Sequence, residues 1–584
     1  MTINMDINGE PHDMDHDQGP YENASIIIPK DQHHCEAMTE NLLREIIRKE
    51  DSDDFEKDFK EFLTGVQIPC KVAMKANNKD SNRYKNIIPY DHSRVQLGGC
   101  QNYINANFIK NLDNKNAYVA TQGPKLGTLG DFWTMVWQLK TGKIVMLANC
   151  VELEKPKVSQ YWPEDASSIE HGDMKISFIS LKQYAAYTIR ELRLEKENAE
   201  EKRVISQFHF TKWPDHGTPD VMHFALLLRH VECINSKLSG PIVVHCSAGV
   251  GRTGTYIAVD ALFKHGKDVG VVDPPAFINS MRQDRMDMVQ TKVQYEFIYH
   301  ALVELFLTEN TTVPMGDLLQ EYRKLDDKRP TLLTGQLSEG MMPENQGKNR
   351  DLKILPGNKN RPFLSSQPTN RTDYINAVFL PSVQNYEGYI ATQWPLPDTA
   401  GDFWAMIYDY KSTAVVILDS DADVDDPSLM PSQESEITGG LFSVQTASRS
   451  CSEGSIVMTE VYLSKAGNDT SHKLKILRMC DWPYDKQTCS EGYITQMVYA
   501  VQGWQKQATF AGPVTVVCRN GSSKCGIFCT VANAIENINL NQRTSLIQVV
   551  RQLQLRCPSF IGTYESYVAC NQEVILHLNS LSEN

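Results

Sequence analysis

The sequence predicts an α/β protein that contains two copies of one domain. A chain of 584 residues is too long for a single hydrophobic core, so several domains are expected. An apolar strand runs into a glycine-rich loop and then into a helical pattern between residues 241 and 262. An altered copy of the same strand and loop returns between residues 516 and 526. We therefore divide the chain into a tail, residues 1–37, and two domains, residues 38–308 and 309–584.

The tail is polar and irregular, which is typical of a disordered segment. Its histidines lack the cysteine or acidic partners of a metal site, so we predict no metal. The pattern changes after Met38, where apolar residues recur every three to four positions as far as Leu63. This spacing predicts two amphipathic helices, separated near residues 51–54.

Composition and charge narrow the class of protein. The formal net charge is −14, which argues against nucleic acid or an anionic membrane as a partner of the whole surface. The 14 cysteines are scattered rather than regularly spaced, which indicates reduced thiols in the cytoplasm. No run of about 18 apolar residues occurs, so no segment is predicted to span a membrane.

The glycine-rich loop has the properties of an anion site with a nucleophile. The apolar run at residues 241–244 predicts a buried strand that ends at His245 and Cys246, and a helix follows Gly254. Backbone amides in such a loop form a concave nest, and the helix dipole adds positive potential. Arg252 can bind two oxygens of a tetrahedral anion through its planar guanidinium. The same field should lower the pKa of Cys246 and produce a reactive thiolate.

Residues 245–254, His-Cys-Ser-Ala-Gly-Val-Gly-Arg-Thr-Gly, resemble the signature of protein tyrosine phosphatases. Residues 82–95, the segment Lys212–Pro219 and residues 288–294 resemble three further segments of that family. The resemblance covers about residues 38–580. It implies two tandem tyrosine-phosphatase domains, each a highly twisted mixed sheet flanked by helices.

The resemblance also implies a role for each part of the site. Cys246 would be the nucleophile, Arg252 would bind the phosphate, Asp215 would be the general acid, and Gln290 would position the hydrolytic water. Asp215 would lie on a movable lid with Trp213. The depth of a slot lined by Tyr84 favours phosphotyrosine over phosphoserine. The residues expected to bind substrate are Tyr84, Asn86, Ser247, Ala248, Gly249, Val250, Gly251 and Gln294.

Four further residues are expected to hold the catalytic and substrate-binding residues in position. They are His245 and Thr253 in the signature, Trp213 in the lid, and Glu152, which by its distance from Tyr161 matches the family's partner of the signature arginine. A carboxylate at Glu152 would hold the guanidinium of Arg252 in place. The alternative is that Glu152 is an ordinary solvated surface residue.

The second copy keeps the cysteine, Cys518, and loses its partners. Lys524 replaces the arginine, Asp351 the ring-stacking tyrosine, and Tyr484 the acid, while Gly562 replaces the glutamine. A lysine is a point charge that cannot clamp two oxygens. We therefore predict an inactive second domain with a regulatory or partner-binding role, with docking on the first domain as one form of it; weak residual activity is the alternative. Nearby Cys525 suggests redox sensing, although the Cys518 thiolate should be less stabilised without an arginine at the loop.

The predicted function is the hydrolysis of phosphotyrosine in proteins, without metal or cofactor. The rival hypothesis is a non-catalytic phosphotyrosine-binding or scaffolding module, and a weaker one is a lipid or dual-specificity phosphatase. The chain resembles the cytoplasmic part of a receptor-type phosphatase, in which residues 1–37 would be juxtamembrane and the membrane would be reached only through a segment outside this chain. The MAM-domain (mu and kappa) type is the most similar subgroup, with the leukocyte common antigen type as the runner-up.

Overall fold

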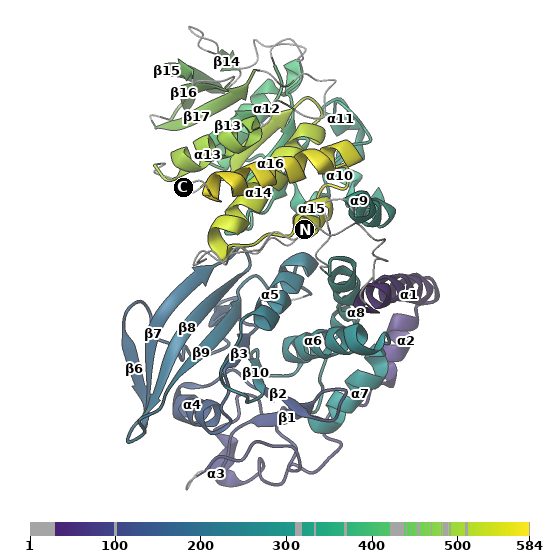
Figure 1. The fold of residues 1–584 in the computed structure, drawn as a ribbon, viewed down its shortest axis with the longest axis vertical. Helices are drawn as coiled ribbons and strands as arrows, with labels where there is room; N and C mark the ends of the chain where they lie inside the picture. The colour runs from purple at the N-terminus through teal and green to yellow at the C-terminus, as the bar shows by residue number, and fades with distance from the viewer. Residues whose placement is uncertain are drawn as a thin grey trace, which may run out of the picture. The chain divides into compact units, whose positions relative to one another are not determined.

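The computed structural model describes residues 30–98, 102–215, 217–309, 318–331, 334–366, 371–420, 437–439, 441–451, 456–468, 470–480, 482, 489, 492–507 and 512–582. These residues form two compact units, which divide after Glu309. Each unit contains one large sheet and its own helices (Figure 1). The two units are described separately below.

An eight-stranded mixed sheet is the framework of the first domain. Its strand order is β1-β2-β10-β3-β9-β8-β7-β6. The four central strands, β2, β10, β3 and β9, run parallel, and the outer strands pair antiparallel. The bounds are β1 Ala106–Lys110, β2 Asn116–Thr121, β3 Lys143–Met146, β6 Ser168–His171, β7 Met174–Gln183, β8 Tyr187–Lys196, β9 Lys202–Phe210 and β10 Ile242–His245. Strand β10 lies between β2 and β3, where parallel strands are buried on both faces, and this explains its unbroken apolar run.

Helices complete the first domain. α6 packs on β2 and β10, α4 packs on β6 and β7, and α8 packs against α1, α2, α5 and α6. A short hairpin of β4 (Val151–Glu152) and β5 (Lys155–Pro156) stands outside the main sheet. The helix bounds are α1 Lys30–Ser52, α2 Asp54–Glu61, α3 Ala76–Lys79, α4 Leu129–Gln138, α5 Val221–Cys233, α6 Gly251–Val269, α7 Pro274–Asp284 and α8 Lys292–Leu307.

The second domain repeats this topology strand by strand. Its sheet has the order β11-β12-β18-β13-β17-β16-β15-β14, with β12, β18, β13 and β17 parallel. The strands are β11 Ala377–Leu380, β12 Tyr389–Gln393, β13 Ala414–Ile417, β14 Ile437–Gly439, β15 Phe442–Cys451, β16 Ile456–Lys465, β17 Ser471–Met479 and β18 Val514–Cys518. The helices are α9 Leu318–Asp327, α10 Ser338–Met341, α11 Pro343–Gln346, α12 Ala400–Asp409, α13 Tyr493–Gln505, α14 Ser523–Asn541, α15 Leu546–Gln554 and α16 Tyr564–Ser582.

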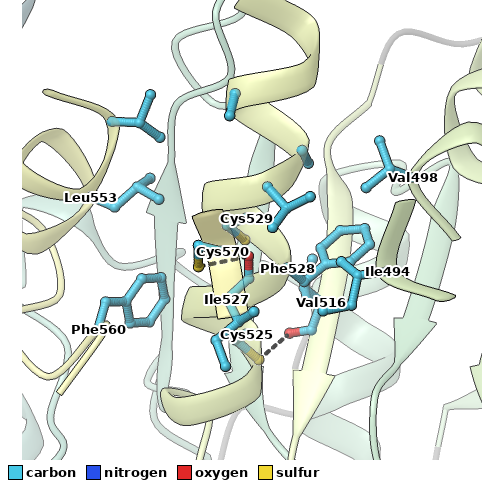
Figure 2. Packing of buried hydrophobic residues seen from close by; sticks show 14 of the residues in the cluster. Ile494, Val498, Val516, Cys525, Ile527, Phe528, Cys529, Leu553, Phe560 and Cys570 are labelled. Atoms are coloured by element: carbon cyan, nitrogen blue, oxygen red, sulfur yellow. Dashed lines mark hydrogen bonds between the residues drawn. The ribbon is translucent and has the colours of Figure 1, made fainter. Parts of the chain in front are cut away.

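Helix α14 is the centre of the second-domain core. Figure 2 shows Ile527, Phe528 and Cys529 of this helix packed among apolar side chains from neighbouring elements. The thiol of Cys525 donates to the carbonyl of Val516 in β18, 3.5 Å away. Each Å² of apolar surface that these side chains remove from water stabilises the domain by roughly 25 cal/mol. The second domain therefore keeps a full core beneath its altered loop.

Most predicted elements of the first domain are confirmed. Two helices separate at Asp53, and the segments at 173–197 and 203–211 form antiparallel strands. The predicted strand, loop and helix around Cys246 are β10 and α6. One difference is at the N-terminus, where α1 begins at Lys30, inside the segment expected to be an irregular tail. The rest of that tail, residues 1–29, lies outside the described residues.

Candidate active site

The loop between β10 and α6 curves around the sulfur of Cys246. Gly249 has φ +76°, and a Cβ at this position would lie 2.2 Å from the carbonyl oxygen of Thr121. Only glycine fits both the conformation and the space. Its amide donates to Cys246 Sγ over 3.3 Å. Cys246 is 5% exposed, so the sulfur lies at the bottom of the loop rather than on the surface.

A buried histidine supports the loop from below. The Nε2 atom of His245 lies 2.8 Å from the hydroxyl of Tyr161, and its Nδ1 lies 3.2 Å from the carbonyl of Cys246. Burial lowers the pKa of His245 to about 4, so the ring is neutral at pH 7. Thr253, also expected to support the loop, is fully buried in the first turn of α6.

Arg252 is held in place by a carboxylate. Its Nη1 and Nη2 atoms donate to the two oxygens of Glu152, at 2.7 and 3.0 Å. Nη1 also donates to the carbonyl of Leu147, 3.0 Å away. The Glu152 side chain is 8% exposed, so it is a buried partner and not a solvated surface residue. A two-point contact of this kind fixes the plane of the guanidinium.

The lid residue Asp215 lies beside the same arginine. Asp215 Oδ1 is 3.1 Å from Lys157 Nζ and 3.8 Å from Arg252 Nη2. The carbonyl of Pro214 accepts a hydrogen bond from Arg252 Nη2 over 3.2 Å. Trp213 is 4% exposed and packs edge-on against Phe224. This segment is therefore anchored by a buried indole and contacts Arg252 of the loop.

Tyr84 contacts the loop at Ser247. Its hydroxyl lies 2.9 Å from Ser247 Oγ, and Ser247 Oγ in turn donates to the carbonyl of Lys157. Tyr84 is 37% exposed, so its ring remains accessible to a ligand. Asn86, two residues further along, is exposed.

Two glutamines border the loop at Gly251. The backbone amide of Gln290 donates to Gln294 Oε1 over 2.9 Å. A Cβ on Gly251 would lie 3.0 Å from Gln294 Oε1 and 3.2 Å from Gln290 Cβ. Residues from five segments distant in the sequence thus meet around Cys246: Tyr84, Glu152, Asp215, the loop itself and Gln290.

The second-domain loop has a similar backbone conformation but different side chains. Gly521 has φ +73°, close to the value at Gly249. Cys518 is 1% exposed, and Lys524 Nζ contacts Asp419 Oδ1 at 2.6 Å. The carboxylate of Asp351 accepts from the amide of Lys353 in its own turn. Tyr484 lies outside the described residues.

The comparison with known proteins identifies the family. A family model described as protein-tyrosine phosphatase matches residues 78–304 and 345–576. The chain belongs to the protein-tyrosine phosphatase family. The two matches make it a tandem phosphatase, with one phosphatase domain in each structural unit.

The tandem phosphatase is similar to receptor-type relatives. It is 33% identical over 550 residues to receptor-type tyrosine-protein phosphatase alpha of Homo sapiens, an alignment that covers 89% of this chain and 68% of the relative. It is 32% identical over 569 residues to receptor-type tyrosine-protein phosphatase F of Bos taurus, which covers 93% of this chain and 30% of the relative. Within its described residues, the phosphatase has no helix both long and apolar enough to cross a bilayer.

Sequence reasoning missed two cations of the phosphatase site. Arg285 is fully buried and donates to the carbonyls of Gly249 and Ala248, which holds the outer edge of the signature loop. Burial lowers its pKa to about 10. The second cation, Lys157, pairs with Asp215 at 3.1 Å. A basic residue four positions before Tyr161 was the available signal for Lys157, whereas nothing in the sequence around Arg285 points to the loop.

Opposing effects act on the thiol of Cys518 in the second phosphatase domain. Burial and the nearby carboxylate of Asp419 raise its pKa, whereas hydrogen bonds from the Cys525 thiol and from the amides of Cys525 and Gly521 lower it, and the net shift is downward. The expectation that this thiolate is less stabilised than one beside an arginine compares the two loops and stays a prediction.

Proposed function

We propose that the first domain hydrolyses phosphotyrosine in proteins through a phosphocysteine intermediate at Cys246, and that the second domain does not catalyse this reaction. The observation that carries the proposal is the assembly around Cys246. The guanidinium of Arg252, in the loop that begins at Cys246, is held at two points by Glu152 and lies 3.8 Å from a carboxylate oxygen of Asp215. In the second domain, Lys524 stands where the arginine would be.

The proposed first step transfers the phosphoryl group to sulfur. Phosphotyrosine enters beside Tyr84, and the loop amides with Arg252 bind the phosphate oxygens and stabilise the charge of the transition state. The thiolate of Cys246 attacks phosphorus, so that the S–P bond forms while the bond from phosphorus to the tyrosyl oxygen breaks. Asp215 gives its proton to the departing phenolate.

The proposed second step releases phosphate. Gln290 positions a water, and Asp215, now a carboxylate, takes a proton from that water as it attacks phosphorus. The S–P bond breaks and Cys246 returns to the thiolate. The role of Gln290 is supported by its position beside Gly251, at the edge of the loop.

The second domain is proposed to regulate the first domain or to bind partner proteins, including by docking on the first domain. Its full core supports a stably folded domain, and Lys524 in place of the arginine supports a non-catalytic role. The substrates of the whole protein, and its attachment to a membrane through a segment outside this chain, follow from the receptor-type relatives and remain part of the proposal.

Removal of the acid tests the catalytic role of Asp215. The Asp215→Ala variant should lose about 10²–10⁴-fold in kcat on a phosphotyrosine peptide, because general acid catalysis contributes that much. It should still bind the peptide, since Arg252 and the loop are intact. A kcat within twofold of the wild type would contradict the proposal. If the wild-type chain binds phosphotyrosine peptide but releases no phosphate, the rival binding-module hypothesis is correct.

A further inference from the structure

Two alanines of the first domain, one in the Cys246 loop and one beside it, are replaced at the second-domain loop, residues 518–524. Ala248 of the first domain corresponds to Asn520, because each stands two residues after the loop cysteine. Ala148 corresponds to Asp419. The backbone supports this second equivalence, since Leu147 N donates to the residue before Cys246, and Leu418 N donates to the residue before Cys518. Two side chains without acceptors are thus replaced by a carboxamide and a carboxylate.

Asn520 accepts hydrogen bonds from the backbone amides at the helix end of the loop. Its Oδ1 accepts from the backbone amides of Ser522 and Ser523, both at 3.0 Å, and from Ser523 Oγ at 3.2 Å. The thiol of Cys518 lies 3.4 Å from the same oxygen. Amides at the start of a helix are the groups that would otherwise bind an oxyanion.

Asp419 occupies the other side. Its Oδ2 accepts from the amide of Arg519, the first residue after Cys518, and its Oδ1 contacts Lys524 Nζ. The side chains of Asp419 and Lys524 are 1% and 4% exposed, so this is a buried ion pair. Lys524 also donates to the carbonyl of Trp482 over 2.7 Å. The carboxylate of Asp419 therefore already pairs with the buried ammonium of Lys524 and accepts a hydrogen bond from a loop amide.

The first domain places its carboxylate differently. Glu152 pairs with Arg252, and its remaining backbone contact is the amide of Asn149, which is not part of the loop. Ala148 and Ala248 have no atom that could accept a hydrogen bond from a loop amide through a side chain. In both domains the carboxylate that pairs with the loop cation comes from outside the loop, but only Asp419 also accepts a hydrogen bond from a loop amide.

We propose that Asp419 and Asn520 are an internal ligand that stands in for a phosphate, so that the second-domain loop is closed to phosphotyrosine and to other oxyanions. Removal of both side chains opens a second oxyanion site on the chain. The inference deepens the proposed function, because it gives a physical reason why the second domain does not capture phosphotyrosine at this loop.

Calorimetric titration of the full chain with tungstate, a tetrahedral oxyanion, tests the inference by stoichiometry. The wild type should bind one equivalent, at the first domain, and the Asp419→Ala/Asn520→Ala variant should bind two. The Asp351→Ala variant is the matched control, since it removes an exposed carboxylate of the same domain, and it should still bind one. Two equivalents on the wild type, or one on a double variant whose second domain unfolds cooperatively, would overturn the inference.

A reciprocal variant guards against a second domain that fails to fold. Ala148→Asp/Ala248→Asn places the same acceptors in the first domain and should reduce tungstate binding from one equivalent to none. Retention of one equivalent by this variant would also overturn the inference. A wild type that binds no tungstate would count against the proposed function of the first domain, and the expected gain of one equivalent in the Asp419→Ala/Asn520→Ala variant would still be measurable.

Discussion

The partner of each loop cation distinguishes the two domains at the scale of single residues. Arg252 receives a two-point contact from Glu152, whereas Lys524 contacts Asp419 through a single nitrogen. A guanidinium keeps N–H groups for a second ligand after such pairing, but an ammonium has only three donors. The substitution of arginine by lysine therefore changes geometry as well as charge distribution.

His245 gives the first domain a pH-dependent stability. Its folded pKa of about 4 is lower than the value near 6.5 in an unfolded chain. The stabilisation is therefore present above pH 6.5 and is lost as the pH falls toward 4. Between pH 7 and pH 5 this residue alone should cost the domain about 2 kcal/mol of unfolding free energy.

Hydrogen exchange of the β10 and β3 amides measures that free energy for the first domain. The loss of unfolding free energy between pH 7 and pH 5 should be about 2 kcal/mol smaller in His245→Gln than in the wild type. His300→Gln, which changes an exposed histidine of the same domain, is the control. An equal pH difference in the wild type and in His245→Gln would show that the buried ring does not titrate as described.

The lid is the element on which the proposed chemistry depends. Trp213 anchors it in an aromatic cluster, and Lys157, the residue after β5, contacts Asp215. Because the ion pair is partly exposed, it contributes only about 1 kcal/mol. Its loss should lower the population of the closed lid several-fold without unfolding the domain.

Steady-state kinetics of Lys157→Ala and Lys155→Ala on one phosphotyrosine peptide test this role. Lys157→Ala should lower kcat about fivefold, which corresponds to ~1 kcal/mol, with little change in KM. Lys155 is exposed in β5, two residues before Lys157, and its replacement should have no effect. A change in KM alone, or equal kcat values for the two variants, would assign Lys157 to substrate binding or to no role in the lid.

The sequence predicted those elements whose signal is local. The apolar run before Cys246 and the alternation at 173–211 are short-range patterns, and both correspond to observed strands. Arg285 and Lys157 were not predicted to act at the site, because their contacts with Gly249 and Asp215 join residues distant in the chain. The same limit applies to Asp419, which carries no motif and meets the second-domain loop only through the sheet.

At the scale of the whole molecule, the two domains share one architecture but carry different side chains in and around the loop. The two sheets have the same strand order, and Gly249 and Gly521 adopt nearly the same conformation. Retention of the fold without the catalytic side chains is expected when a domain is kept for its surface or its contacts, since fold and function are separable. All phosphatase activity of the chain should therefore come from the first domain.

The release of phosphate from a phosphotyrosine peptide by Cys246→Ser and by Cys518→Ser, each in the full chain, tests this central claim most directly. The two substitutions are chemically matched, and both replace a buried thiol at the end of a central strand. We predict that Cys246→Ser abolishes turnover, because the hydroxyl is a far weaker nucleophile than a thiolate. Cys518→Ser should retain the wild-type kcat/KM within about twofold. Activity that survives Cys246→Ser, or that is lost in Cys518→Ser, would contradict the account.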